Sequence, residues 1–228
     1  MKQRFFFRIG DDYTYMDKNG YVSHESYAVM IKSLGYYFLE ANIIEKINAN
    51  EEGYFDFNKS LVDIGCEIGE YCEWTKFAYY YMFDGNRDKI TIANFNMLIR
   101  EREDICESHV ALLGDRVEDI PYDGFTGDAY ADPKNVKMVK TTTLDSFDIN
   151  NVGLIKVDVE GMEEKVLRGG VGTIVRNGYP PILFELWDPE KTGFDRERYD
   201  SLVNFIQGLG YEILWNWGDE QTHLAVKK

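Results

Sequence analysis

The sequence is poor in the residues that build metal and disulfide sites. It has three cysteines without Cys-x-x-Cys spacing, and three scattered histidines. This argues against a disulfide framework, a zinc site and metal binding through histidine. A divalent metal held by Asp158 or Glu160 is left open but is not otherwise indicated. Reduced cysteines favour a cytoplasmic-type compartment. No serine lies in a Gly-x-Ser-x-Gly elbow and no cysteine has a convincing histidine partner, so neither kind of nucleophile is indicated.

Long apolar runs and positive charge are also scarce. No run approaches the roughly 18 apolar residues that span a bilayer. The apolar patch at residues 5–7 is too short for the core of a signal peptide, so we expect a cytoplasmic protein. Lys and Arg number 25 against 40 Asp and Glu, which gives a net charge of −15. Such a surface repels phosphate backbones and anionic membranes, so we expect neither as a partner.

The 228 residues suffice for one α/β domain with a well-buried core but not for two domains with large cores. From residue 60 onward, strand-like and helix-like segments alternate, which predicts a mainly parallel sheet covered on both faces. The connection at residues 216–221 is too short for a crossover helix, so the last two strands should form an antiparallel edge hairpin. The expected strands are 61–64, 79–83, 105–113, 154–159, 182–186, 211–215 and 222–226, and the expected helices are 70–77, 87–100, 161–176 and 196–209.

Two segments lie outside this alternation. Residues 1–59 contain a short strand near 4–9 and a helical pattern over 23–49, and we expect them to form an N-terminal extension or cap on a domain of residues 60–228. An irregular insertion is expected at about residues 115–140. Long irregular segments are often functional, so a lid or substrate loop and a plain surface excursion both remain open.

The most informative stretch is Leu61-Val62-Asp63-Ile64-Gly65-Cys66-Glu67-Ile68-Gly69. A strand, a glycine turn and a helix start place backbone N–H groups at a crevice. The spacing is Gly-x-x-x-Gly and not the Gly-x-Gly-x-x-Gly of dinucleotide binders. Asp84 follows Asp63 by 21 residues, where a ribose-binding carboxylate would lie. The pattern indicates a cofactor with a ribose and no pyrophosphate, and S-adenosylmethionine fits that description.

Within this candidate cofactor site the residues differ in how well the pattern supports them. Gly65 and Gly69 are favoured because a turn pressed against a ligand needs small residues. Asp63 either lies near the cofactor's amino group or caps the turn. Position alone places adenine at the end of the third strand, around Val110 and Ala111.

The second dense signal is Lys156-Val157-Asp158-Val159-Glu160-Gly161. Alternation along a strand would put Lys156, Asp158 and Glu160 on one side. Charges within an otherwise apolar strand are expensive unless they are paired or functional, which makes these residues catalytic candidates. Glu185 is a lone acid at the end of another apolar strand, where it would either act as a base with a raised pKa or pair with Lys156.

Together these residues identify a resemblance. The Leu61–Gly69 turn, Ala111–Asp115, Thr142–Ser146, Leu154–Gly161 with Glu163, Val166–Gly170 and Pro181–Glu185 occur in the order found in FkbM-type S-adenosylmethionine-dependent methyltransferases. The resemblance covers about residues 60–226. Its most specific part is the Leu-Ile-Lys-Val-Asp-Val-Glu-Gly run that ends at Gly161.

The resemblance implies a class I methyltransferase (Rossmann-like) sheet, bound S-adenosylmethionine and, usually, O-methylation of a hydroxyl on a sugar, polyketide or similar small molecule. Carried over by position, Asp63, Gly65 and Gly69 would line the methionine end and Asp84 the ribose. Asp158 and Glu160 would flank the reacting centre.

The chain departs from the family pattern in two places. Cys66 and Glu67 replace a small residue and an amide in the glycine turn, and Glu67 would either bind the cofactor's ammonium or weaken the site. Asp84-Gly85 replaces Glu-Pro at the end of the second strand. A cofactor-binding module without activity is therefore a second hypothesis. A nicotinamide enzyme is a third, disfavoured by the missing dinucleotide motif.

Overall fold

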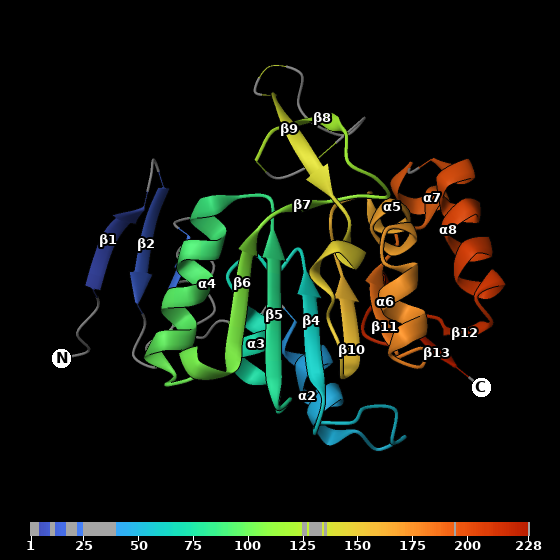
Figure 1. The fold of residues 1–228 in the computed structure, drawn as a ribbon, viewed down its shortest axis with the longest axis horizontal. Helices are drawn as coiled ribbons and strands as arrows, with labels where there is room; N and C mark the ends of the chain where they lie inside the picture. The colour runs from blue at the N-terminus through green and yellow to red at the C-terminus, as the bar shows by residue number, and fades with distance from the viewer. Residues whose placement is uncertain are drawn as a thin grey trace.

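The computed structural model describes residues 5–9, 12–16, 22–24, 40–124, 127, 134, 136–193 and 195–227. Its main sheet has seven strands, of which β13 runs antiparallel to both of its neighbours while the rest run parallel to one another (Figure 1). The predicted parallel sheet with an antiparallel edge hairpin is confirmed. In spatial order the strands are β12 (Tyr211–Leu214), β13 (Thr222–Lys227), β11 (Ile182–Glu185), β10 (Val152–Val157), β4 (Ser60–Ile64), β5 (Tyr79–Asp84) and β6 (Cys106–Val110).

Helices cover both faces of this sheet, which is why its central strands are apolar throughout. Every residue of β4 and of β10 is buried. One face packs against α2 (Ala41–Ala49), α3 (Glu70–Trp74) and α4 (Arg87–Ile99). The other packs against α5 (Glu163–Arg168), α6 (Val171–Arg176) and α8 (Arg196–Gly208). Among the described helices, none is long and apolar enough to cross a membrane.

The strand order places a crevice at the middle of the sheet. From β4 the chain first builds outward through β5 and β6, and it then returns to add β10 and β11 on the other side of β4. Crossover helices diverge at such a reversal and leave an opening beyond the carboxyl ends of the strands, where ligands of parallel sheets bind. The residues that follow β4, β5, β10 and β11 therefore meet at one edge.

A small sheet stands above this edge (Figure 1). In it, β9 (Lys137–Thr142) pairs with β7 (Leu112–Leu113) on one side and with β8 (Asp119–Tyr122) on the other. The 115–140 segment, which we expected to be irregular, thus supplies two regular strands. Sequence reasoning missed them because Pro121 and several charged residues interrupt the apolar pattern.

The N-terminal part contains a separate antiparallel sheet of β1 (Phe5–Ile9), β2 (Asp12–Met16) and β3 (Val22–His24). The helix expected over 23–49 is wrong at its start, because Ser23 lies in β3. Its end is right, since α2 covers the last part of the range. Residues 25–39 lie outside the described part of the chain.

Two elements that we predicted to be continuous are each divided in the structure. The 161–176 helix is two helices, α5 and α6, separated at Gly169 and Gly170. A Cβ at Gly169 would come within 2.0 Å of the Gly114 carbonyl oxygen, so a larger residue cannot occupy this junction. The predicted 105–113 strand divides at Ala111 between β6 of the main sheet and β7 of the small one. The remaining described helices are short: η1 (Glu103–Ile105), η3 (Leu144–Phe147) and α7 (Pro189–Thr192).

Candidate active site

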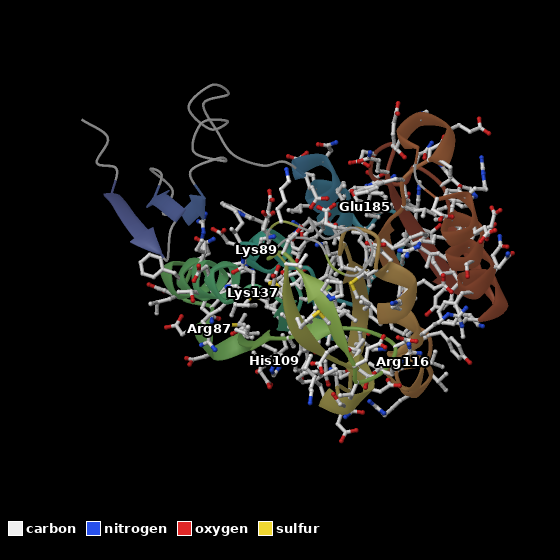
Figure 2. All side chains as sticks on the ribbon, turned by 90° about the horizontal axis from the view of Figure 1, so that it is seen from above. Arg87, Lys89, His109, Arg116, Lys137 and Glu185 are labelled. Atoms are coloured by element: carbon white, nitrogen blue, oxygen red, sulfur yellow. The ribbon has the colours of Figure 1, made fainter. Side chains whose placement is uncertain are left out.

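A cavity of about 360 Å³ lies at the carboxyl ends of β4, β5, β10 and β11. Figure 2 looks down on this edge and shows Lys89 on the α4 side and Glu185 toward β11. Seven predicted site residues line the cavity: Gly65, Glu67, Asp84, Ala111, Asp158, Glu160 and Glu185. Five do not line it: Asp63, Cys66, Gly69, Val110 and Lys156.

The glycine turn is held against two strands. The N–H groups of Gly65 and Cys66 both donate to the Phe83 carbonyl at the end of β5, at 2.9 and 3.0 Å. Gly65 has φ +73°, and a Cβ there would come within 1.7 Å of the Asp158 carbonyl oxygen. Gly65 is therefore required because two backbone segments approach each other. This differs from the predicted reason, which was the approach of a ligand.

The Asp84 carboxylate joins the end of β5 to the same turn. Its Oδ2 accepts a hydrogen bond from the Glu67 N–H at 3.2 Å, and its Oδ1 accepts one from the Asn86 N–H at 2.7 Å. Burial raises the pKa of Asp84 to about 6, against the opposing effects of the nearby Lys89 charge and the two backbone donors. Each carboxylate oxygen has two lone pairs, so Asp84 can still accept hydrogen bonds from a ligand.

Lys89, on α4, is the only cation among the described residues that line the cavity. Its Nζ lies 4.0 Å from Oε1 of Glu67, whose own backbone adopts the left-handed conformation with φ 49°. Sequence reasoning missed Lys89. Its place in the first turn of the helix that follows Asp84 could have pointed to it.

Lys156 is only 5% exposed and lines a second, smaller cavity that shares Glu40, Asp158 and Glu185 with the main one. Its Nζ donates to the Gly65 carbonyl at 2.7 Å and lies 3.4 Å from both Asp63 Oδ1 and Asp158 Oδ2. Burial lowers the pKa of Lys156, but the adjacent Asp158 and Asp63 raise it further than burial lowers it. The charged ammonium therefore ties β4 to β10. Among the ion pairs of the described residues, Lys156 pairs with these two aspartates and not with Glu185.

The catalytic candidates Asp158 and Glu160 lie in a loop and not in a strand, because β10 ends at Val157. The buried Glu163 holds this loop, since its Oε1 accepts hydrogen bonds from the N–H groups of Val159 and Gly161, at 2.9 and 3.1 Å. The left-handed backbone of Glu160, with φ 57°, ends the strand alternation that we predicted. Both carboxylates reach the cavity nonetheless.

Burial and the charge of Asp158 raise the proton affinity of the two glutamates on this side of the cavity. Burial and then the charge of Asp158 raise the pKa of Glu160 to about 7. Burial and then the charges of Asp158 and Glu160 raise the pKa of Glu185 to about 9. At neutral pH this wall therefore holds protons that cationic ligand groups could replace.

Of the two residues expected near adenine, only one borders the cavity. Ala111 lines it with Leu112 and Tyr122, whereas the Val110 side chain is 45% exposed and points elsewhere. Successive residues of an extended chain face opposite sides, so only one of the pair could line the cavity. Tyr122 comes from β8 and packs against Gly85, where a Cβ would meet its ring at 2.9 Å.

Three further carboxylates that line the cavity were missed, Glu40, Glu70 and Asp219. Glu70 is the first residue of α3 and is only 7% exposed. Its Oε1 has no hydrogen-bond partner among the described residues. Burial raises the pKa of Glu40 to about 7, although the nearby Lys156 charge lowers it in part. No pattern in the sequence distinguishes Glu40 from other acids.

The described residues contain no group of three or more His, Cys, Asp or Glu side chains arranged to hold a metal ion.

Comparisons with known proteins agree with this geometry. The family model described as "Methyltransferase FkbM domain" matches residues 63–213. An FkbM methyltransferase from Methylobacillus flagellatus has a similar structure, with a TM-score of 0.57 and 19% identity over 80% of this chain and 47% of that one. The present chain thus spans about half the length of that relative. No curated protein matches.

Two other solved structures share the fold. A candidate caffeoyl-CoA O-methyltransferase from Staphylococcus aureus has a TM-score of 0.54 and 10% identity over 90% of this chain and 91% of that one. An rRNA methylase from Streptococcus thermophilus has a TM-score of 0.50 and 12% identity, over 84% and 98%. The sheet is that of class I methyltransferases, and the chain belongs to the FkbM methyltransferase family.

Proposed function

We propose that this protein is an S-adenosylmethionine-dependent O-methyltransferase that acts on a hydroxyl of a small molecule or sugar. One observation carries the proposal: the glycine turn and the Asp158–Glu160 loop border the same cavity and are tied together through Lys156. A cofactor beside the turn would thus lie within reach of the carboxylates beyond β10.

The residues present fit this cofactor. In what we call the cofactor half, Asp84 offers free lone pairs for ribose hydroxyls, and Leu112 and Tyr122 offer apolar surface for adenine. Glu67 offers a carboxylate for the cofactor's ammonium. The crevice is acidic, which suits a cofactor of net positive charge and disfavours a pyrophosphate.

What we call the acceptor half consists of Asp158, Glu160 and Glu185. When bound, the cofactor supplies an electrophilic methyl group on a sulfonium. We assign Glu160 as the general base that takes the proton from the acceptor hydroxyl, because a pKa of about 7 suits proton transfer at neutral pH. Asp158 is held by Lys156 and orients the hydroxyl. Holding the oxygen in line with the methyl carbon supplies much of the remaining rate.

The remaining sequence-based expectations enter as part of the proposal. Residues 1–59 would cap the domain of residues 60–228, and the segment around 115–140, whose Tyr122 borders the cofactor half, would act as a lid or substrate loop. A strongly acidic chain disfavours a nucleic-acid acceptor. A cavity of about 360 Å³ suits a small molecule.

Mass spectrometry of reactions with S-adenosylmethionine and a panel of hydroxyl compounds tests this function. We expect one product heavier by a methyl group together with S-adenosylhomocysteine. Tight cofactor binding with no methylation across the panel would favour the inactive binding module. Absence of cofactor binding would contradict both hypotheses, and binding of NAD would favour the third.

A further inference from the structure

Glu70 is a buried carboxylate with one oxygen, Oε1, left unpaired among the residues that the structure describes. Only 7% of the residue is exposed, and it lines the cavity. Burial and then the charge of Glu40 raise the pKa of Glu70 well above its usual range. Leaving a polar group in this state costs free energy unless a ligand pairs with it.

Glu70 does not stand alone, because further carboxylates extend from it to the acceptor half. Glu40 lines the main cavity beside Glu70 and also a smaller adjoining one of about 10 Å³. Asp158 and Glu185 line both cavities as well. The carboxylates therefore form one connected acidic wall from the start of α3 to the end of β11.

The cations of the site offset this wall only in part, since the Lys156 charge lowers the pKa of Glu40 and of Glu70 but burial raises both by more. Lys156 already lies between Asp63 and Asp158. Lys89 lies beside Glu67, and its charge lowers the pKa of Glu160 by less than burial and Asp158 raise it. S-Adenosylmethionine carries only one net positive charge, so it cannot compensate all of these carboxylates, and those that hold a proton at neutral pH can release it when a cationic group binds beside them. Burial strengthens the attraction of such a wall for a cation.

We propose that the methyl acceptor carries an ammonium group near its reacting hydroxyl, and that Glu70, Glu40 and Glu185 bind this ammonium. The proposal rests on the proposed function and deepens it by naming the substrate class: amino alcohols and amino sugars. Acceptors that carry phosphate or carboxylate groups are repelled by the same wall. An organic ammonium needs carboxylates that surround it loosely, whereas a divalent metal needs ligands converging at close to 2 Å.

Binding to the intact chain saturated with S-adenosylhomocysteine tests the proposal. The probes are ethanolamine hydrochloride, ethylene glycol, sodium chloride and magnesium chloride, compared at equal ionic strength by their shifts of the melting temperature. We expect an apparent dissociation constant for ethanolamine at least about tenfold below that for ethylene glycol. We expect this preference to fall about tenfold in Glu70→Gln and in Glu185→Gln, and to persist in the exposed control Glu52→Gln.

The other outcomes separate this proposal from the proposed function. If S-adenosylhomocysteine does not bind, the cofactor site itself is wrong. If it binds but ethanolamine has no advantage over ethylene glycol or sodium, the ammonium proposal is overturned and the methyltransferase remains. Stronger stabilisation by magnesium also overturns it in favour of a metal site. So does a Glu70→Gln variant that loses affinity for S-adenosylhomocysteine and keeps the ethanolamine preference.

Discussion

The carboxylates in the two halves of the cavity have different surroundings. In the cofactor half, Asp84 accepts hydrogen bonds from two backbone N–H groups, which hold it in place whether or not a ligand is bound. In the acceptor half, Glu160 and Glu185 are crowded by one another and by Asp158, and the pKa values rise to about 7 and about 9. One half is organised by the backbone. The other has a charge excess for a ligand to neutralise.

Replacing the proposed base should give the largest effect, confined to the acceptor half. We expect Glu160→Gln to lower kcat by about 10² to 10⁴, the usual contribution of a general base. Affinity for S-adenosylhomocysteine should stay unchanged, because the cofactor half does not contain Glu160. Steady-state kinetics and calorimetry measure the two quantities, with Glu52→Gln as the control. Full turnover in both Glu160→Gln and Asp158→Asn would show that neither carboxylate is the base.

Gly65 joins the halves, so a side chain there should disturb both. Strain at φ +73° and the collision with the Asp158 carbonyl together should lower the free energy of unfolding of Gly65→Ala by about 2 to 5 kcal/mol. Gly53 has the same φ of +73°, and a Cβ there would meet nothing within 4 Å among the described residues, so Gly53→Ala measures the strain alone. Equal losses in urea unfolding of the two variants would contradict the close approach.

Glu163 holds the loop that carries Asp158 and Glu160, so its removal should loosen only the acceptor half. Glu163→Ala leaves the N–H groups of Val159 and Gly161 without their acceptor, which should cost about 1 to 3 kcal/mol and lower kcat. Glu163→Gln keeps an acceptor oxygen and should restore most of both. The neighbouring Glu164→Ala, which loses a surface ion pair with Arg168, serves as the control and should change stability by less than about 1 kcal/mol.

The raised pKa values around the acceptor half should also make stability depend on pH. Burial raises the pKa of Glu160 and Glu163 from 4.5 to about 7 and that of Glu185 to about 9. The folded state therefore binds more protons than the unfolded state. The contribution of these groups to the free energy of unfolding is therefore fully present below about pH 4.5, and it is lost as the pH rises toward 9. We expect the melting temperature to fall over that range, and Glu185→Gln to flatten the fall above pH 7. A melting temperature that rises with pH over this range would contradict the raised pKa values of these buried carboxylates.

The sequence predicted the main sheet because its signals are local. Buried parallel strands such as β4 and β10 are continuous apolar runs, and the short 216–221 connection permits only an antiparallel pairing. The predicted ends of strands and helices were wrong where backbone geometry determines them. β10 ends at Val157, before the loop that contains the left-handed Glu160, and the close approach at Gly169 divides a helix. Neither feature is visible in hydrophobic periodicity.

The residues around the cavity were predictable where they directly follow a strand. Asp84, Asp158 and Glu185 could be found because strand ends converge at one edge of a parallel sheet. Glu40 and Glu70 could not, since their approach to the cavity depends on how α2 and α3 pack on the sheet. Val110 lies outside the cavity because position along the chain does not determine which side of an extended segment faces it.

Titration calorimetry with S-adenosylhomocysteine tests the central claim most directly, by comparing the wild-type protein with Asp84→Asn. We predict binding at one site in the wild type and at least about tenfold weaker binding in the variant, since a charge-assisted hydrogen bond contributes about 1.5 to 3 kcal/mol. The exposed Asp104→Asn should bind as the wild type does. No binding to the wild type, or equal binding by Asp84→Asn, would contradict the account.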